Sequence, residues 1–172
     1  LKELFENKRF KKGIHFEDIQ LIPQLVLNSK IIAQTQNYHY QYLERSDSIT
    51  KTHTEKGLDI LKAAEDVEVT LLNSKYKDRK KELKNFHIFE GVYSFLAYLA
   101  FVKDEKVYEI LKTQYQHFVK EKGITQKEIF GYSRFGENYF LQLPMKKKIY
   151  YLLFFSGIKP SFFSDIFLKF KK

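Results

Sequence analysis

The segment Gly13–Ile19 has the sequence GIHFEDI and precedes a predicted helix. It joins an apolar run with the pattern of a strand to an apolar run with the pattern of a helix, and two adjacent carboxylates stand at the junction. The first turn of a helix leaves backbone N–H groups unpaired and favours negative charge. Glu17 and Asp18 are therefore expected at a helix start, where they either cap the helix or face a cleft.

The segment after this junction has the spacing of an amphipathic helix followed by strands. The apolar residues spaced at i, i+3, i+6 and i+7 are Ile19, Ile22, Leu25 and Val26. This spacing predicts a helix over Ile19–Leu27 that buries the face carrying these residues. Lys30–Thr35 is expected to form a short strand, and Tyr38–Leu43 a second strand in which tyrosines alternate with other residues.

The remainder of the chain has the periodicity of helices alone. We expect helices over Glu55–Leu72, Phe86–Val102, Val107–Phe118 and Pro144–Phe155. Thr52 and Glu55 have the spacing of a capping box, as do Thr125 and Glu128. A membrane-spanning helix needs about 20 apolar residues. The uninterrupted apolar run Val92–Val102 is shorter than this, so it predicts a helix buried among its neighbours.

Composition narrows the classes of function. The chain has 172 residues, of which 44% are hydrophobic, so a packed core is expected. It contains no cysteine, which excludes a disulfide scaffold and any thiolate nucleophile or thiolate metal site. The net charge of +9 favours an anionic partner. The lysines are spread over several elements without a nucleic-acid motif, so no specific nucleic-acid partner is expected.

Four motifs in a fixed order resemble the second half of the catalytic domain of family 2 bacterial glycosyltransferases. They are Gly13–Asn28 (GIHFEDIQLIPQLVLN), Lys30–Ala33, Tyr38–Tyr42 (YHYQY) and Arg45–Thr50 (RSDSIT). The resemblance covers roughly residues 1–60 and implies a fragment of a GT-A fold. The expected fold is α+β and mostly α, with residues 1–51 as the C-terminal piece of the GT-A domain and residues 52–172 as a helical, bundle-like extension.

The resemblance also implies roles for individual residues. In the family, the aspartate of the E-D pair is the base that takes a proton from the acceptor hydroxyl, and this position corresponds to Asp18. Glu17 and His15 would then support the acceptor or its loop. Arg45 and Ser48 would contact the diphosphate of the donor. Transfer would proceed with inversion, from a nucleotide sugar to a lipid-linked or glycan acceptor, in the synthesis of bacterial surface polysaccharide or glycoconjugate.

The donor half of such an enzyme has no counterpart in this sequence. The chain contains neither an Asp-x-Asp motif nor a glycine-rich phosphate loop. We therefore expect a piece of a longer polypeptide that holds no metal itself, while the intact enzyme uses Mg²⁺ or Mn²⁺. The isolated piece is expected to be inactive.

The helical part suggests where the protein acts. The tail, 161–172, combines phenylalanines with lysines, a pattern of helices that lie on anionic membranes. A cytoplasmic protein at the inner face of the membrane is therefore expected, and its helices are candidates for homo-oligomer contacts. The competing interpretation is a non-enzymatic helical interaction module, in which Glu17 and Asp18 are only a cap. Docking of the tail on the helical core is an equal alternative to membrane binding.

Overall fold

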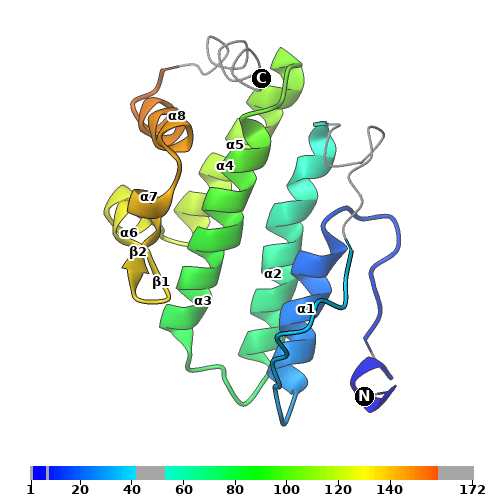
Figure 1. Ribbon diagram of the computed structural model, residues 1–172. Helices are drawn as coiled ribbons and strands as arrows, with labels where there is room; N and C mark the ends of the chain where they lie inside the picture. Colours follow the sequence, from blue (N-terminus) through cyan, green and yellow to red (C-terminus); the bar gives the residue numbers. More distant parts are fainter. Residues whose placement is uncertain (1, 7, 42–52, 159–172) are drawn as a thin grey trace.

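The computed structural model describes residues 2–6, 8–41 and 53–158 (Figure 1). The α-helices are α1 (Glu17–Asn28), α2 (Leu58–Leu72), α3 (Lys80–Phe86), α4 (Phe95–Leu99), α5 (Glu105–Glu121), α6 (Gln126–Gly131), α7 (Tyr139–Gln142) and α8 (Met145–Phe155). The other elements are the 3₁₀-helices η1 (Lys2–Phe5) and η3 (Glu55–Gly57), the π-helical segment η4 (His87–Ser94), and the strands β1 (Ser133–Arg134) and β2 (Glu137–Asn138). The described part is thus mostly α with one small sheet, as expected.

One long helix organises the arrangement. The elements α3, η4 and α4 follow one another without a break, because the residues at both junctions have right-handed helical torsion angles. Helices α1 and α2 lie side by side along one flank of this long helix, whereas α6, α7, α8 and the β1–β2 hairpin lie along the other flank (Figure 1). Helix α5 packs against η4, α2 and α4.

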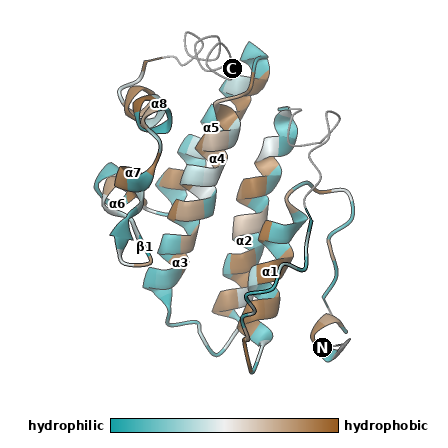
Figure 2. Cartoon of the chain, in the orientation of Figure 1, coloured by the Kyte–Doolittle hydropathy of each residue, from teal (hydrophilic) through white to brown (hydrophobic). Residues whose placement is uncertain are grey.

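The core forms where α2, η4, α4 and α5 meet. The residues that are almost fully buried there include Ile60, Ala64, Val92, Phe95, Leu96, Leu99 and Leu111. The same helices carry hydrophilic residues on their outer sides (Figure 2). Burying an aliphatic or aromatic side chain of this size contributes roughly 1.5–3 kcal/mol. The burial predicted for the helix around Val92–Val102 is confirmed, and within the described ranges no helix is long and apolar enough to cross a membrane.

The close approach of η4 and α5 depends on a glycine. A Cβ atom added to Gly91 would lie 2.3 Å from the ring of Phe118. Phe118 itself is only 2% exposed, so its ring has little room to move. Only a residue without a side chain leaves the space that this ring occupies.

The predicted buried face of α1 is confirmed in part, because Leu25 is buried and the half-buried Ile19 packs against the core. Ile22 and Val26 are 50% and 46% exposed, whereas Leu21, Gln24 and Leu25 are buried. Both sets of residues have helical spacing, so periodicity alone does not choose between them. The partner helix makes the choice, because α1 packs along α2. There the Gln24 carboxamide oxygen accepts hydrogen bonds from Lys8 and from the Thr70 hydroxyl.

The predicted strands are absent where the structure describes them. Residues 31–36 and 38–41 have no regular secondary structure, and Tyr42 and Leu43 lie outside the described residues. A strand needs a neighbour to satisfy its backbone groups, and within the described ranges no strand lies beside these segments. Among the described residues, a hairpin forms instead between β1 and β2, around Phe135 and Gly136, both of which have positive φ.

Capping boxes were predicted at two helix starts. Thr125 and Glu128 form the predicted capping box at the start of α6. Thr52 lies outside the described residues, and Thr54 caps η3 by accepting a hydrogen bond from the Lys56 N–H. The predicted tail, 161–172, also lies outside the described part of the chain.

Candidate functional site

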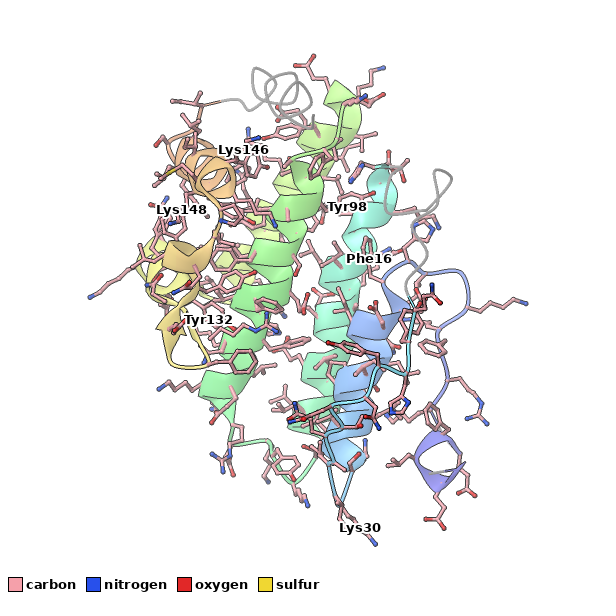
Figure 3. The ribbon with its side chains drawn as sticks, viewed as in Figure 1. Phe16, Lys30, Tyr98, Tyr132, Lys146 and Lys148 are labelled. Carbon is pink, nitrogen blue, oxygen red and sulfur yellow. The ribbon has the colours of Figure 1, made fainter. Side chains whose placement is uncertain are left out.

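The loop that leads into α1 is held by residues of the helical part. The His15 N–H donates a hydrogen bond to Asp59 Oδ2 at 3.0 Å, and Asp59 is 5% exposed. Phe16 adopts a left-handed conformation with φ of 59°. Its ring packs edge-to-face on Tyr98, with centroids 5.6 Å apart (Figure 3). The start of α1 is therefore fixed on α2 and α4.

Contacts around Tyr98 extend this anchor. The Tyr98 hydroxyl accepts a hydrogen bond from the Thr54 N–H at 2.7 Å, and it lies 2.9 Å from the Thr54 carbonyl oxygen, to which it donates. Lys56 Nζ donates to the Gly13 carbonyl at 3.4 Å. The segment before α1 and the segment before α2, which are about 40 residues apart in sequence, are thereby held together.

The predicted catalytic carboxylate lies in the first turn of α1. Glu17 and Asp18 are both exposed, and the Asp18 carboxylate accepts a hydrogen bond from the Ile19 N–H at 2.9 Å. Residue His15 precedes them and is half-buried. Arg45 and Ser48, predicted to contact the donor diphosphate, lie outside the described residues.

A second carboxylate, which the sequence analysis did not identify as a site residue, lies on the long helix within electrostatic range of Asp18. Glu90 is half-buried in η4, accepts a hydrogen bond from Ser94, and interacts electrostatically with Asp18 and Arg134. Burial raises the pKa of Glu90 above its ordinary 4.5, and the negative charge of Asp18 adds to this, whereas Ser94 and Arg134 act in the opposite direction. Glu90 is thus a partly buried carboxyl group whose environment disfavours its charged form.

Arg134, on strand β1, connects the β1–β2 hairpin with Glu90 through the attraction of their charges. Its guanidinium lies 4.1 Å from the centre of the Phe89 ring and 5.1 Å from that of Phe135. Such cation–π contacts hold an exposed arginine in place. Tyr132, labelled in Figure 3, precedes the hairpin. Burial raises the pKa of its hydroxyl, the charge of Arg134 lowers this pKa, and the charge of Glu90 raises it.

We call Asp18, Glu90, Ser94, Tyr132 and Arg134 the Asp18–Glu90 site. Its residues come from α1, from η4 and from the hairpin with the segment before it. The π-helical geometry of η4 is rare in proteins and is frequent at functional sites. The arrangement offers an exposed carboxylate that can accept a proton, a half-buried carboxyl group, a phenol and a cation.

One sequence signal could have indicated Glu90. It follows His87 directly before a long apolar run, and a carboxylate in such a helix needs a polar partner when it is buried. The partners Asp18 and Arg134 are 72 and 44 positions away in the numbering, so no local pattern connects them.

The structure gives no metal centre at this site. Among the residues that it describes, no group of three or more His, Asp or Glu side chains is placed to hold a metal ion. The residues present therefore do not fit the divalent cation expected for the intact enzyme. Two cavities, of about 430 and 360 Å³, lie elsewhere, and none of the predicted site residues lines either.

Comparison with protein-family models, with curated proteins and with solved structures found no match.

Proposed function

We propose that the chain is the C-terminal portion of an inverting, nucleotide-sugar-dependent glycosyltransferase of family 2, which makes bacterial surface polysaccharide or glycoconjugate. The observation that carries the proposal is the position of Asp18. It is an exposed carboxylate in the first turn of α1, after a loop anchored by Asp59 and Tyr98, and its charge acts on Glu90 of the long helix.

In this proposal Asp18 is the general base. It takes the proton from the acceptor hydroxyl while the oxygen of that hydroxyl attacks the anomeric carbon of the donor sugar and the nucleotide diphosphate leaves. The reaction needs the base within hydrogen-bond reach of the hydroxyl and in a fixed direction. The His15–Asp59 hydrogen bond supplies this rigidity, and Glu17 would help to hold the acceptor.

Glu90, Arg134 and Tyr132 belong to the acceptor side. The half-buried Glu90 carboxyl group, which already accepts a hydrogen bond from Ser94, would hydrogen-bond to a hydroxyl of the acceptor. Arg134 and Tyr132 offer further donors. The acceptor would thus be held between α1 and the hairpin, with its reacting hydroxyl toward Asp18.

Exposed apolar side chains support membership of a larger domain. Ile31 and Ile32 are 86% and 72% exposed, and Tyr38 and Tyr40 are 101% and 82% exposed, in segments with little regular structure. Isoleucine and tyrosine are enriched in strands that pair within a sheet. We propose that they join the sheet of the donor half, which would also bring the metal-binding carboxylates, and that the enzyme works at the inner face of the membrane.

The test is the substitution Asp18→Asn in a polypeptide that includes the donor half. Release of nucleotide from a panel of UDP- and GDP-sugars should fall by about 10²–10⁴-fold, the usual contribution of a general base. The melting temperature should stay unchanged, because Asp18 is exposed. Asp78→Asn is the matched control, since Asp78 is an exposed aspartate in the turn between α2 and α3.

Two results would contradict the proposal. One is full activity in the Asp18→Asn variant. The other is a lower melting temperature without loss of transfer, which would make the carboxylate a cap and favour the helical interaction module. The isolated 172-residue chain is expected to transfer no sugar.

A further inference from the structure

The outer face of α8 carries a stripe of exposed apolar side chains. Met145, Ile149 and Leu152 are 68%, 42% and 50% exposed. Their spacing of i, i+4 and i+7 places them in line along one side of the helix. We call these three residues the α8 stripe. Single exposed apolar side chains are common on protein surfaces, whereas several in line form a continuous surface that favours a partner.

The inner face of α8 is held by the core. Tyr150 and Tyr151 are buried, and the Tyr151 hydroxyl donates a hydrogen bond to the Tyr93 carbonyl at 3.0 Å. The Phe154 ring packs edge-to-face on Tyr115, with centroids 5.4 Å apart. Helix α8 is thus fixed against η4 and α5, and the α8 stripe points away from them.

Three lysines accompany the α8 stripe. Lys146, Lys147 and Lys148 stand in the first turn of α8, which has no acidic residue and no side-chain cap. At about 100° per residue, Lys146 and Lys148 lie on either side of the stripe; both are labelled in Figure 3. The first turn of a helix favours negative charge, so three cations there do not serve the stability of the helix. They indicate an anionic partner instead.

Charge separates the candidate partners. The sequence has no Asp or Glu between positions 138 and 164. A symmetric contact with α8 of a second copy would therefore bring lysine clusters together, and like charges repel. Three side chains are also few for a stable dimer, which buries about 800 Å² on each partner. Residues 159–172 carry four lysines and one aspartate, so their net charge disfavours this contact too.

Charge also singles out α8 among the helices with exposed apolar residues. Helix α1 exposes Ile22 and Val26, but it contains no lysine. Residues 31–41, which the proposed function assigns to the sheet of the donor half, lie on the flank of α1, whereas α8 lies on the other flank of the long helix (Figure 1). The two surfaces would therefore not compete.

We propose that α8 docks on an anionic membrane, with the α8 stripe at the boundary between headgroups and acyl chains and with Lys146 and Lys148 beside the lipid phosphates. Helices that combine an apolar face with lysines lie in the plane of the membrane in this way. The long lysine stems pack beside the stripe while their ammonium groups reach the phosphates. This surface rests on the membrane location in the proposed function, and it does not depend on the chemistry assigned to Asp18.

The test measures sedimentation of the whole chain with phosphatidylcholine vesicles that either contain or lack phosphatidylglycerol. The chain should bind the vesicles that contain phosphatidylglycerol more tightly. The double variant Lys146→Gln, Lys148→Gln should weaken this binding by about fivefold for each lysine removed. The double variant Lys80→Gln, Lys81→Gln is the matched control, because these lysines are exposed in the first turn of α3 and their loss changes the net charge equally.

A second pair of variants tests the apolar stripe. Ile149→Gln should weaken binding to the same vesicles by about fivefold. Ile110→Gln is the matched control, because Ile110 on α5 is 41% exposed, almost the same fraction as Ile149. Since each substitution changes a side chain that is not buried, circular dichroism should show a folded protein in every variant.

Equal binding to the two kinds of vesicle would overturn the proposal, as would equal losses in either variant and its control. Self-association that Ile149→Gln abolishes, without vesicle binding, would assign the stripe to a second copy. DNA binding that only the lysine variant loses, without vesicle binding, would assign the lysines to nucleic acid. Vesicle binding needs no sugar transfer, so its absence alongside lost transfer in Asp18→Asn would refute the docking surface and leave the proposed base standing.

Discussion

Replacing Asp59 by alanine should loosen the loop that carries the proposed catalytic base. Asp59 lies on α2 and is 5% exposed, and it accepts a hydrogen bond from the His15 N–H at 3.0 Å. Lys62 Nζ lies 3.2 Å from its other oxygen. Burial alone raises the pKa of Asp59, but the bond from His15 and the charge of Lys62 outweigh it and bring the pKa below the ordinary 3.8. Asp59 is therefore ionised in the folded protein at neutral pH.

The size of the effect follows from these contacts. A hydrogen bond to a charged group contributes about 1.5–3 kcal/mol to stability. The pair with Lys62 adds little, about 0.2–1 kcal/mol, because Lys62 is 63% exposed. We expect Asp59→Ala to lower the free energy of unfolding by about 2–4 kcal/mol. Because the folded pKa is depressed, this stabilisation is present above pH 3.8 and is lost as the pH falls through the folded value.

Urea unfolding followed by circular dichroism measures the loss. Asp66→Ala is the control, since Asp66 on the same helix makes an exposed pair with Lys11 at 3.2 Å and should contribute at most about 1 kcal/mol. Hydrogen exchange at the His15 amide should quicken in Asp59→Ala and not in the control. Equal losses of stability in the two variants, or unchanged exchange at His15, would refute the anchoring role of Asp59.

Two further predictions concern the long helix. Gly91→Ala should destabilise the protein by about 1–3 kcal/mol in urea unfolding, because the added Cβ would lie 2.3 Å from the Phe118 ring. Gly131→Ala is the control: its added Cβ would meet no atom within 4 Å, and stability should change by less than about 0.5 kcal/mol. Equal losses of stability in the two variants would contradict this packing. Burial depresses the pKa of His87 below 6.5 despite the charge of Glu68. The unfolded chain therefore binds a proton at His87 more readily than the folded chain, so the melting temperature should fall as the pH drops below 6.5. The variant His87→Gln should show a weaker pH dependence. An unchanged pH dependence in that variant would contradict the assignment to His87.

Local sequence patterns determined several elements correctly. Leu61, Ala64, Val67 and Leu71 recur at helical spacing in the sequence, and all four are buried on one face of α2. Thr125 with Glu128 marked the start of α6. The apolar run after Glu90 gave a buried helix. These features depend on residues three or four positions apart, whose side chains lie on one face of a helix wherever that helix is placed.

Tertiary contacts decided the rest. Leu21 and Leu25 are buried while Ile22 and Val26 are exposed, because α2 lies against one face of α1. The segment from Lys30 to Thr35 has strand-like residues but no neighbouring strand in the described part of the chain, and a strand is stabilised by its partner.

The candidate site residues also divide into those indicated by a local sequence pattern and those brought together by tertiary contacts. The sequence by itself pointed to Asp18 and to its place at a helix start, because the pattern around it is local. Only the folded chain brings Glu90 into electrostatic range of Asp18, or places His87 Nε2 3.6 Å from Glu68 Oε2. Each of these pairs joins two helices, and the packing of those helices, which side-chain periodicity does not encode, sets the distance between the charges.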